Sequence, residues 1–137
     1  MAFHIHTDLH DNGIQYLKDN CDKIVICDAD PGITTYTNAN NQPDGSPAGY
    51  KLAEQTVTST DFTVGAGDTA DGRKVSHDPF EDVEVLYTGS ADHVAYLDTG
   101  ASKILLVKPF TVRSVIDGDF VTIPSGKLEA LAPTVIV

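Results

Sequence analysis

The sequence has little of what marks several protein classes. It contains no tryptophan and only two cysteines, Cys21 and Cys27. Their spacing matches neither a redox CxxC pair nor a zinc knuckle, so the chain carries no cysteine motif for either chemistry. We therefore expect both thiols to be small residues of the hydrophobic core rather than a disulfide.

Basic residues are also scarce. Lysine and arginine together number 9 against 20 aspartates and glutamates, which gives a formal net charge of −11. Nucleic-acid phosphates and anionic lipid surfaces both attract basic proteins, so this charge argues against either partner. It does favour solubility.

No stretch of the sequence is long and apolar enough to span a bilayer. The segment Met1–His6 has neither a basic n-region nor a long apolar h-region, so it does not have the features of a secretory signal. We expect the chain to fold in a cytoplasm.

The most informative stretch runs from Asp92 to Ala101, where an apolar strand ends in Asp98-Thr99-Gly100. This is the signature of retroviral-type aspartic proteases, in which two such turns share one proton, so this chain would have to dimerise. The later glycines, Gly118 and Gly126, lie in polar turns, and no flap follows. We favour a hairpin turn in which Asp and Gly have their usual roles. A dimeric protease is the remote alternative.

Three histidines, His4, His6 and His10, lie near Asp8 and Asp11. A His-x-His pair on a strand can ligate zinc or another transition metal. The alternative is a polar N-terminal segment without a metal, which we favour.

Two other patterns resemble known sites only in part. Asp28-Ala29-Asp30 and Asp68–Gly72 are similar to calcium loops, but neither continues to the bidentate glutamate that an EF-hand needs. His93 stands beside Asp92 with no obvious nucleophile, and we expect a partly buried, hydrogen-bonded histidine. No phosphate-binding or nucleophile-elbow motif is present. We assign no catalytic, cofactor-binding or metal-ligating residue and no cofactor.

The chain is long enough for one domain with a hydrophobic core. Thr7 to Asp22 is the one convincing helix, with Thr7 as N-cap and Gly13 weakening its middle. We expect a long loop over 28–49, a β-rich body over 52–124 and an apolar tail over 125–137. The tail would pack on the domain or meet a partner.

The strands expected are Lys23–Cys27, Thr56–Val64, Arg73–His77, Val83–Tyr87, His93–Leu97, Ile104–Val107, Phe110–Val115 and Phe120–Ile123. Asp117-Gly118 predicts a hairpin between the last two of these strands. The fold class expected is mostly β: a single-domain antiparallel β-sandwich or barrel with one N-terminal α-helix.

Six short segments carry a family resemblance: Ile26-Cys27-Asp28, Thr34-Thr35-Tyr36, Gly72-Arg73-Lys74-Val75, Ala91–Asp98, Lys103–Val107 and Phe120–Pro124. In this order they resemble a family of small virion proteins of tailed bacteriophages, which includes head decoration, or cement, proteins. The resemblance covers about Val25 to Pro124. It implies a structural protein rather than an enzyme.

From this resemblance we expect a protein that decorates and stabilises the capsid. Its partners would be the major capsid protein and further copies of itself, with trimers at local threefold positions as one arrangement. It would be made in the host bacterial cytoplasm and reside on the capsid surface of the virion. The loop Asp28–Gly49 and the apolar tail would make the contacts. The alternative is another virion component, such as a connector, tail or fibre-associated protein.

Overall fold

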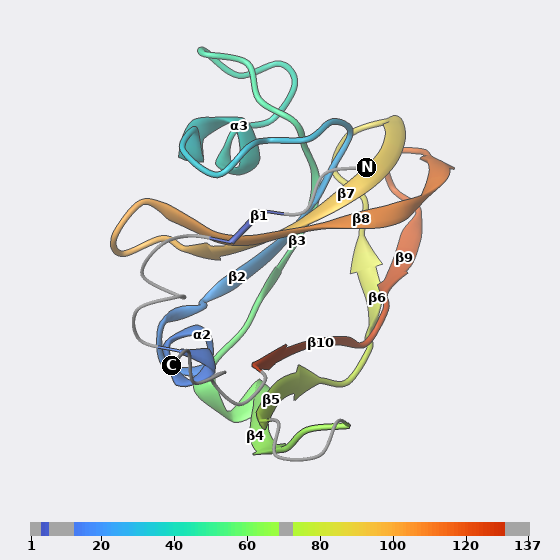
Figure 1. Ribbon diagram of the computed structural model, residues 1–137. Coiled ribbons are helices and arrows are strands. Elements are labelled where there is room, and N and C mark those ends of the chain that lie inside the picture. Colours follow the sequence, from blue (N-terminus) through green and yellow to red (C-terminus); the bar gives the residue numbers. More distant parts are fainter. Residues whose placement is uncertain (1–3, 6–12, 69–72, 131–137) are drawn as a thin grey trace.

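Antiparallel strands make up 51% of the structure, a computed structural model that describes residues 4–5, 13–68 and 73–130. The described strands form three sheets of five, three and two strands (Figure 1). The mostly-β antiparallel prediction is confirmed. Of its two alternatives, a closed barrel is not formed by the described strands.

The largest sheet has the order β1 (His4–Ile5), β8 (Lys103–Val115), β7 (Gly89–Asp98), β2 (Lys23–Cys27) and β3 (Lys51–Thr56). Strand β2 is the predicted strand Lys23–Cys27, whose β-branched run suits a buried position in a sheet. Strands β7 and β8 form the hairpin predicted around Asp98, with Asp98 opposite Lys103.

The second sheet has the order β10 (Gly126–Ala130), β5 (Arg73–His77) and β4 (Phe62–Ala66). The third pairs β6 (Phe80–Glu84) with β9 (Phe120–Ile123). A 3₁₀ turn, η1 (Ser59–Asp61), leads into β4. Strands β5 and β9 have the predicted bounds.

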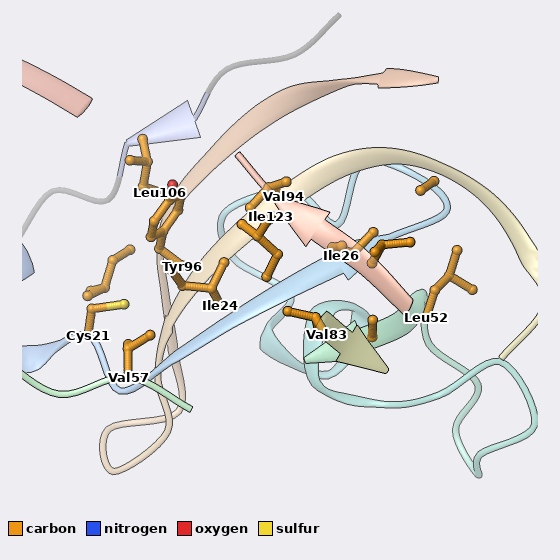
Figure 2. Packing of buried hydrophobic residues seen from close by; sticks show 14 of the residues in the cluster. Cys21, Ile24, Ile26, Leu52, Val57, Val83, Val94, Tyr96, Leu106 and Ile123 are labelled. Carbon is orange, nitrogen blue, oxygen red and sulfur yellow. The ribbon is translucent and has the colours of Figure 1, made fainter. Parts of the chain in front are cut away.

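Both faces of the five-stranded sheet are covered. On one face, Ile24, Tyr96 and Leu106 from adjacent strands contribute to the main core. This core lies between the sheet and the layer formed by the smaller sheets and helix α2 (Ile14–Asn20) (Figure 1). Figure 2 shows Ile123 of β9 beside Val94 of β7 in this space.

The opposite face is covered by the segment between β2 and β3. Val25, Ala95 and Leu97 are buried there in a second cluster, against which Tyr36 and Tyr50 pack. This segment contains a short helix, α3 (Tyr36–Asn40), which lies across the sheet from α2 (Figure 1). The prediction of an irregular loop over 28–49 missed this helix because its polar sequence, Tyr-Thr-Asn-Ala-Asn, has no helical periodicity.

The N-terminal helix is shorter than predicted. Helix α2 begins at Ile14, and Gly13 is its N-cap with φ of 71°, a backbone conformation that glycine adopts without strain. The helix ends at Asn20, and Cys21 is the extended residue after it. The predicted part from Thr7 to Asn12 lies outside the described residues.

Several strand predictions need correction. No hairpin joins β8 and β9, because β8 pairs with β7 whereas β9 pairs with β6. The turn at Asp117-Gly118 instead meets Val85, whose carbonyl accepts the Gly118 N–H at 2.8 Å. The chain thus uses this turn to pass from one sheet to another.

Other strand boundaries also differ, and β7 begins at Gly89 rather than at His93 and ends at Asp98 rather than at Leu97. The predicted strand Thr56–Val64 is divided between β3 and β4 by η1, where Thr58 and Asp61 form a capping box. The two predicted strands within residues 104–115 are one strand, β8, despite Pro109. Strand β6 begins at Phe80 rather than at Val83, and Val85 forms only an isolated bridge with Ala53.

Part of the expected tail belongs to a sheet. Residues Gly126 to Ala130 form β10, which pairs with β5 in place of ending the fold as a free tail. Leu128 packs against the main core. Residues 131–137 lie outside the described part of the chain. Within that part, no helix is long and apolar enough to cross a membrane.

A substitution at Leu97 tests whether the segment between β2 and β3 encloses a hydrophobic core on its face of the sheet. Leu97 is fully buried in the second cluster, so Leu97→Ala should lower the free energy of unfolding by about 2–5 kcal/mol. The matched change Leu86→Ala, at a side chain that is 36% exposed, should have a clearly smaller effect. Urea denaturation measures both. Equal small losses would mean that this face of the sheet is not covered in solution.

Candidate functional site

The Asp98 turn is built by local hydrogen bonds. The Asp98 carboxylate accepts the Ala101 N–H at 3.2 Å, and the Thr99 N–H and hydroxyl donate to the Asp22 carboxylate at 2.9 and 2.5 Å. Asp22 follows α2, so these bonds fasten the hairpin tip to the chain next to the helix. The geometry is that of the predicted hairpin turn.

His93 lies on β7 and is hydrogen-bonded as expected, but its side chain is buried rather than partly buried. Its Nδ1 is 2.7 Å from the Asp92 carboxylate, and its Nε2 has no hydrogen-bond partner among the described residues. Both cysteines are free and buried, which confirms the expectation for them. Burial raises the pKa of Cys21 to about 12 and also raises that of Cys27, so neither thiol is a reactive thiolate at neutral pH.

The aspartate-rich segments are turns and ion pairs. Asp30 accepts the Gly32 N–H at 2.9 Å. Asp68 pairs with Lys74 and Lys127, and these two ammonium groups lower the pKa of its carboxyl to about 2. Among the described residues, no three His, Cys, Asp or Glu side chains gather in a way that could hold a metal. The side chains of the N-terminal histidines and Asp71 lie outside the described residues.

A groove of about 570 Å³ lies between β8 and the segment that joins β9 to β10. The lining residues are Val94, Tyr96, Lys108, Pro109, Phe110, Thr111, Val112, Arg113, Thr122, Ile123, Pro124 and Ser125. Its volume is within the range of ligand-binding clefts. The register shift between β7 and β8 leaves Phe110, Thr111 and Val112 bulged opposite Asp92, and such bulges redirect side chains.

Two cations that have no acidic partner among the described residues line this apolar groove. Arg113 is exposed and forms no ion pair within the described part of the chain. Lys108 is half-buried, and its Nζ is 3.5 Å from the Lys127 carbonyl oxygen. Desolvation, with the nearby charge of Lys127, lowers the pKa of Lys108. An anionic group entering the groove would gain both charges in a partly desolvated setting.

A histidine–tyrosine pair lies where the groove meets the main core. His77 Nε2 is 2.7 Å from the Tyr96 hydroxyl, and His77 Nδ1 is 2.8 Å from the Asp78 carbonyl oxygen. A carbonyl only accepts, so Nδ1 carries the proton and Nε2 accepts from Tyr96. Burial lowers the pKa of His77 and raises that of Tyr96, so both groups are neutral at pH 7.

Gly126 makes this arrangement possible. A Cβ at Gly126 would lie 2.5 Å from the Tyr96 hydroxyl and 2.6 Å from His77 Nε2. The first residue of β10 therefore passes directly over the pair, and only glycine leaves room for it. The aromatic rings of Phe62 and Phe80 flank His77 at centroid distances of 5.7 and 5.2 Å. The pair is thus packed on all these sides, as a structural hydrogen bond would be.

Sequence reasoning did not single out any of the groove residues. Arg113 lies in the expected strand Phe110–Val115, and Lys108 directly follows the expected strand Ile104–Val107. Strand periodicity does not show which residues face an opening. The one usable signal was Pro109, because proline within a strand indicates an edge or a bulge. No family model, curated protein or solved structure matches the chain.

Acid should weaken the fold through His77. Its pKa is lowered in the folded state, so its contribution is complete above the unfolded pKa of about 6.5 and is lost as the pH falls through the lower folded pKa. Stability should therefore decrease from pH 7.5 to 5.5. The double variant His77→Phe/Tyr96→Phe removes both hydrogen-bonding partners and should flatten this decrease. Chemical denaturation at each pH measures it, and parallel curves for both proteins would contradict the assignment.

Proposed function

We propose that the protein is a structural component of a tailed-bacteriophage particle that binds and stabilises the outside of the capsid. The resemblance of segments along its sequence to small virion proteins is one support. The observation that carries the proposal structurally is a set of exposed apolar side chains at the β8–β9 connection. These are Leu86, Val112, Ile116 and Phe120, with exposed fractions of 36, 67, 61 and 61%.

These side chains belong to neighbouring segments. Val112 and Ile116 lie on and just after β8, and Phe120 begins β9. Leu86 adjoins them because the Val85 N–H donates to the Asp119 carbonyl oxygen at 2.7 Å. Several exposed large apolar side chains on adjoining segments make a candidate protein–protein contact surface. We call these four residues the apolar end of the protein.

Burying the apolar end would supply binding free energy. Each large apolar side chain contributes about 1.5–3 kcal/mol of binding free energy when fully buried. Several small contacts are therefore enough to hold the protein on a shell that offers many equivalent positions. A protein that binds the assembled shell but not its separated subunits stabilises the shell by mass action. The net charge of −11 keeps the unbound protein soluble despite its apolar end.

The structure changes which segment is the best contact candidate. The segment between β2 and β3 was expected to reach a neighbour, but Ile33, Tyr36 and Tyr50 pack against its own sheet. The apolar end has no such cover among the described residues. The proposed contact with the major capsid protein therefore uses the β8–β9 connection, with trimeric self-association as the arrangement that local threefold positions favour.

Binding to phage heads that lack the protein tests this proposal. Purified protein should co-sediment saturably with these heads, in a ratio set by the shell lattice. Phe120→Asp and Ile116→Asp should each weaken binding at least tenfold, because a buried carboxylate replaces an apolar contact. Thr63→Asp, at an exposed position on β4, adds the same charge elsewhere and should have no effect.

Two results would contradict the proposal. Wild-type protein that leaves the heads bare but sediments with isolated tails would make it a connector, tail or fibre-associated component. Equal binding by Phe120→Asp, Ile116→Asp and wild type would remove the apolar end as the contact surface. Circular dichroism of each variant separates lost contact from lost folding.

A further inference from the structure

The groove beside β8 has the shape of a site for an extended chain. One rim is the continuous run from Lys108 to Arg113 and the other is the run from Thr122 to Ser125. Lys108 and Arg113 pair with Val94 and Ala91, which are three residues apart on β7, so at roughly 3.3 Å per strand residue this rim extends about 10 Å. The groove is partly open to solvent along these rims. Such a trough fits a chain that keeps one side in water better than a ligand that must be enclosed.

Beside the groove, the edge of β8 has no pairing partner among the described strands. Strand β1 pairs only with Leu106 and Val107, and no described strand pairs with the outer edge of β8 beyond them. Pro109 has no N–H, and the bulge over Phe110 to Val112 interrupts the regular spacing of the edge. A bound chain would therefore be held by side-chain pockets and charges together with isolated backbone hydrogen bonds, not by a continuous ladder.

The charges of the groove oppose those of the rest of the protein. The chain carries −11 overall, yet this groove presents Lys108 and Arg113, neither of which has a carboxylate partner among the described residues. Arg113 is one of only two arginines in the sequence. The guanidinium group suits bidentate binding of a carboxylate. A ligand that complements this groove is apolar in part and acidic in part.

We propose that this groove binds an extended peptide segment of another protein, with apolar side chains at alternate positions and an Asp or Glu that pairs with Arg113. The apolar side chains would contact Phe110 and Pro124, which line the groove and keep exposed surface. Lys108, at the inner end, would take a second acidic group or a backbone carbonyl of the peptide. This site is distinct from the apolar end, with which it shares only Val112.

Selection from a random heptapeptide library displayed on a carrier tests the proposal without a capsid. Enriched peptides should alternate apolar residues and contain Asp or Glu, and basic peptides should be depleted. One enriched peptide, synthesised, is then titrated into the full-length protein by isothermal calorimetry. Arg113→Gln should weaken its binding about tenfold, as expected for one charge-assisted contact. Thr122→Trp, which fills the groove from an exposed position, should abolish binding.

The controls separate this site from other surfaces. Arg73→Gln removes the same charge from an exposed position on β5, outside the groove, and should leave peptide affinity unchanged. Phe120→Asp should also leave it unchanged, although the same variant should lose capsid binding, so the two proposals can fail separately. Amide chemical shifts of Lys108 and of residues 110–113 on β8 should move on peptide addition.

Three outcomes would overturn the inference. One is a library selection without enrichment. Another is an enriched peptide whose affinity survives both Arg113→Gln and Thr122→Trp. The third is binding of dodecanoate, an amphipathic carboxylate, with the same dependence on Arg113 while no peptide is selected. That last result would make the groove a site for small amphiphiles.

Discussion

The fold depends on a central strand, β7, whose side chains are buried on both faces. Its neighbours β2 and β8 satisfy its backbone hydrogen bonds, with Tyr96 opposite both Ile24 and Leu106. The residues Ala91 and His93 to Leu97 are all buried. A strand of this kind cannot face water on either side, so the chain must supply a layer above the sheet and a layer below it. The rest of the architecture meets that requirement.

The two layers are built differently. The lower layer combines α2 with the smaller sheets, which gives it regular backbone hydrogen bonds and the main core (Figure 1). The upper layer is the single segment between β2 and β3, anchored by the Tyr50 N–H to the Asn38 carbonyl oxygen at 2.7 Å and by the buried Ala39. A segment rich in proline, glycine and asparagine can thus be a structural cover.

Sequence reasoning succeeded where local pattern and tertiary role agree. The run Ile24-Val25-Ile26 is apolar because both faces of β2 are buried, and this predicted its bounds. The Asp98 turn was also predicted, because Asp and Gly have local reasons to be there. The hairpin expected at Asp117-Gly118 failed for a different reason. A turn motif shows that the chain reverses, but not which strand each arm will join.

The candidate site could not be predicted for the same reason. Lys108 and Arg113 line a groove only because β8 lies opposite the segment that joins β9 to β10, and these segments are brought together by long-range contacts. Even then, periodicity marks Lys108 merely as one strand residue among others. Its surroundings, with Tyr96, His77 and Gly126 within reach, come from strands remote in sequence. Core residues can be recognised in a sequence by their hydrophobicity, whereas residues that line a groove have no such sequence signal.

The groove and the apolar end follow from one structural event. Strand β8 bulges against β7 at Phe110 to Val112 and ends at Val115, and the chain then turns toward β9. Apolar side chains that would otherwise be enclosed between the layers are left at the surface, as the 67% exposure of Val112 shows. The bulge and the turn that follows it therefore bring both surfaces to the same part of the described structure, where exposed apolar side chains lie near Lys108 and Arg113.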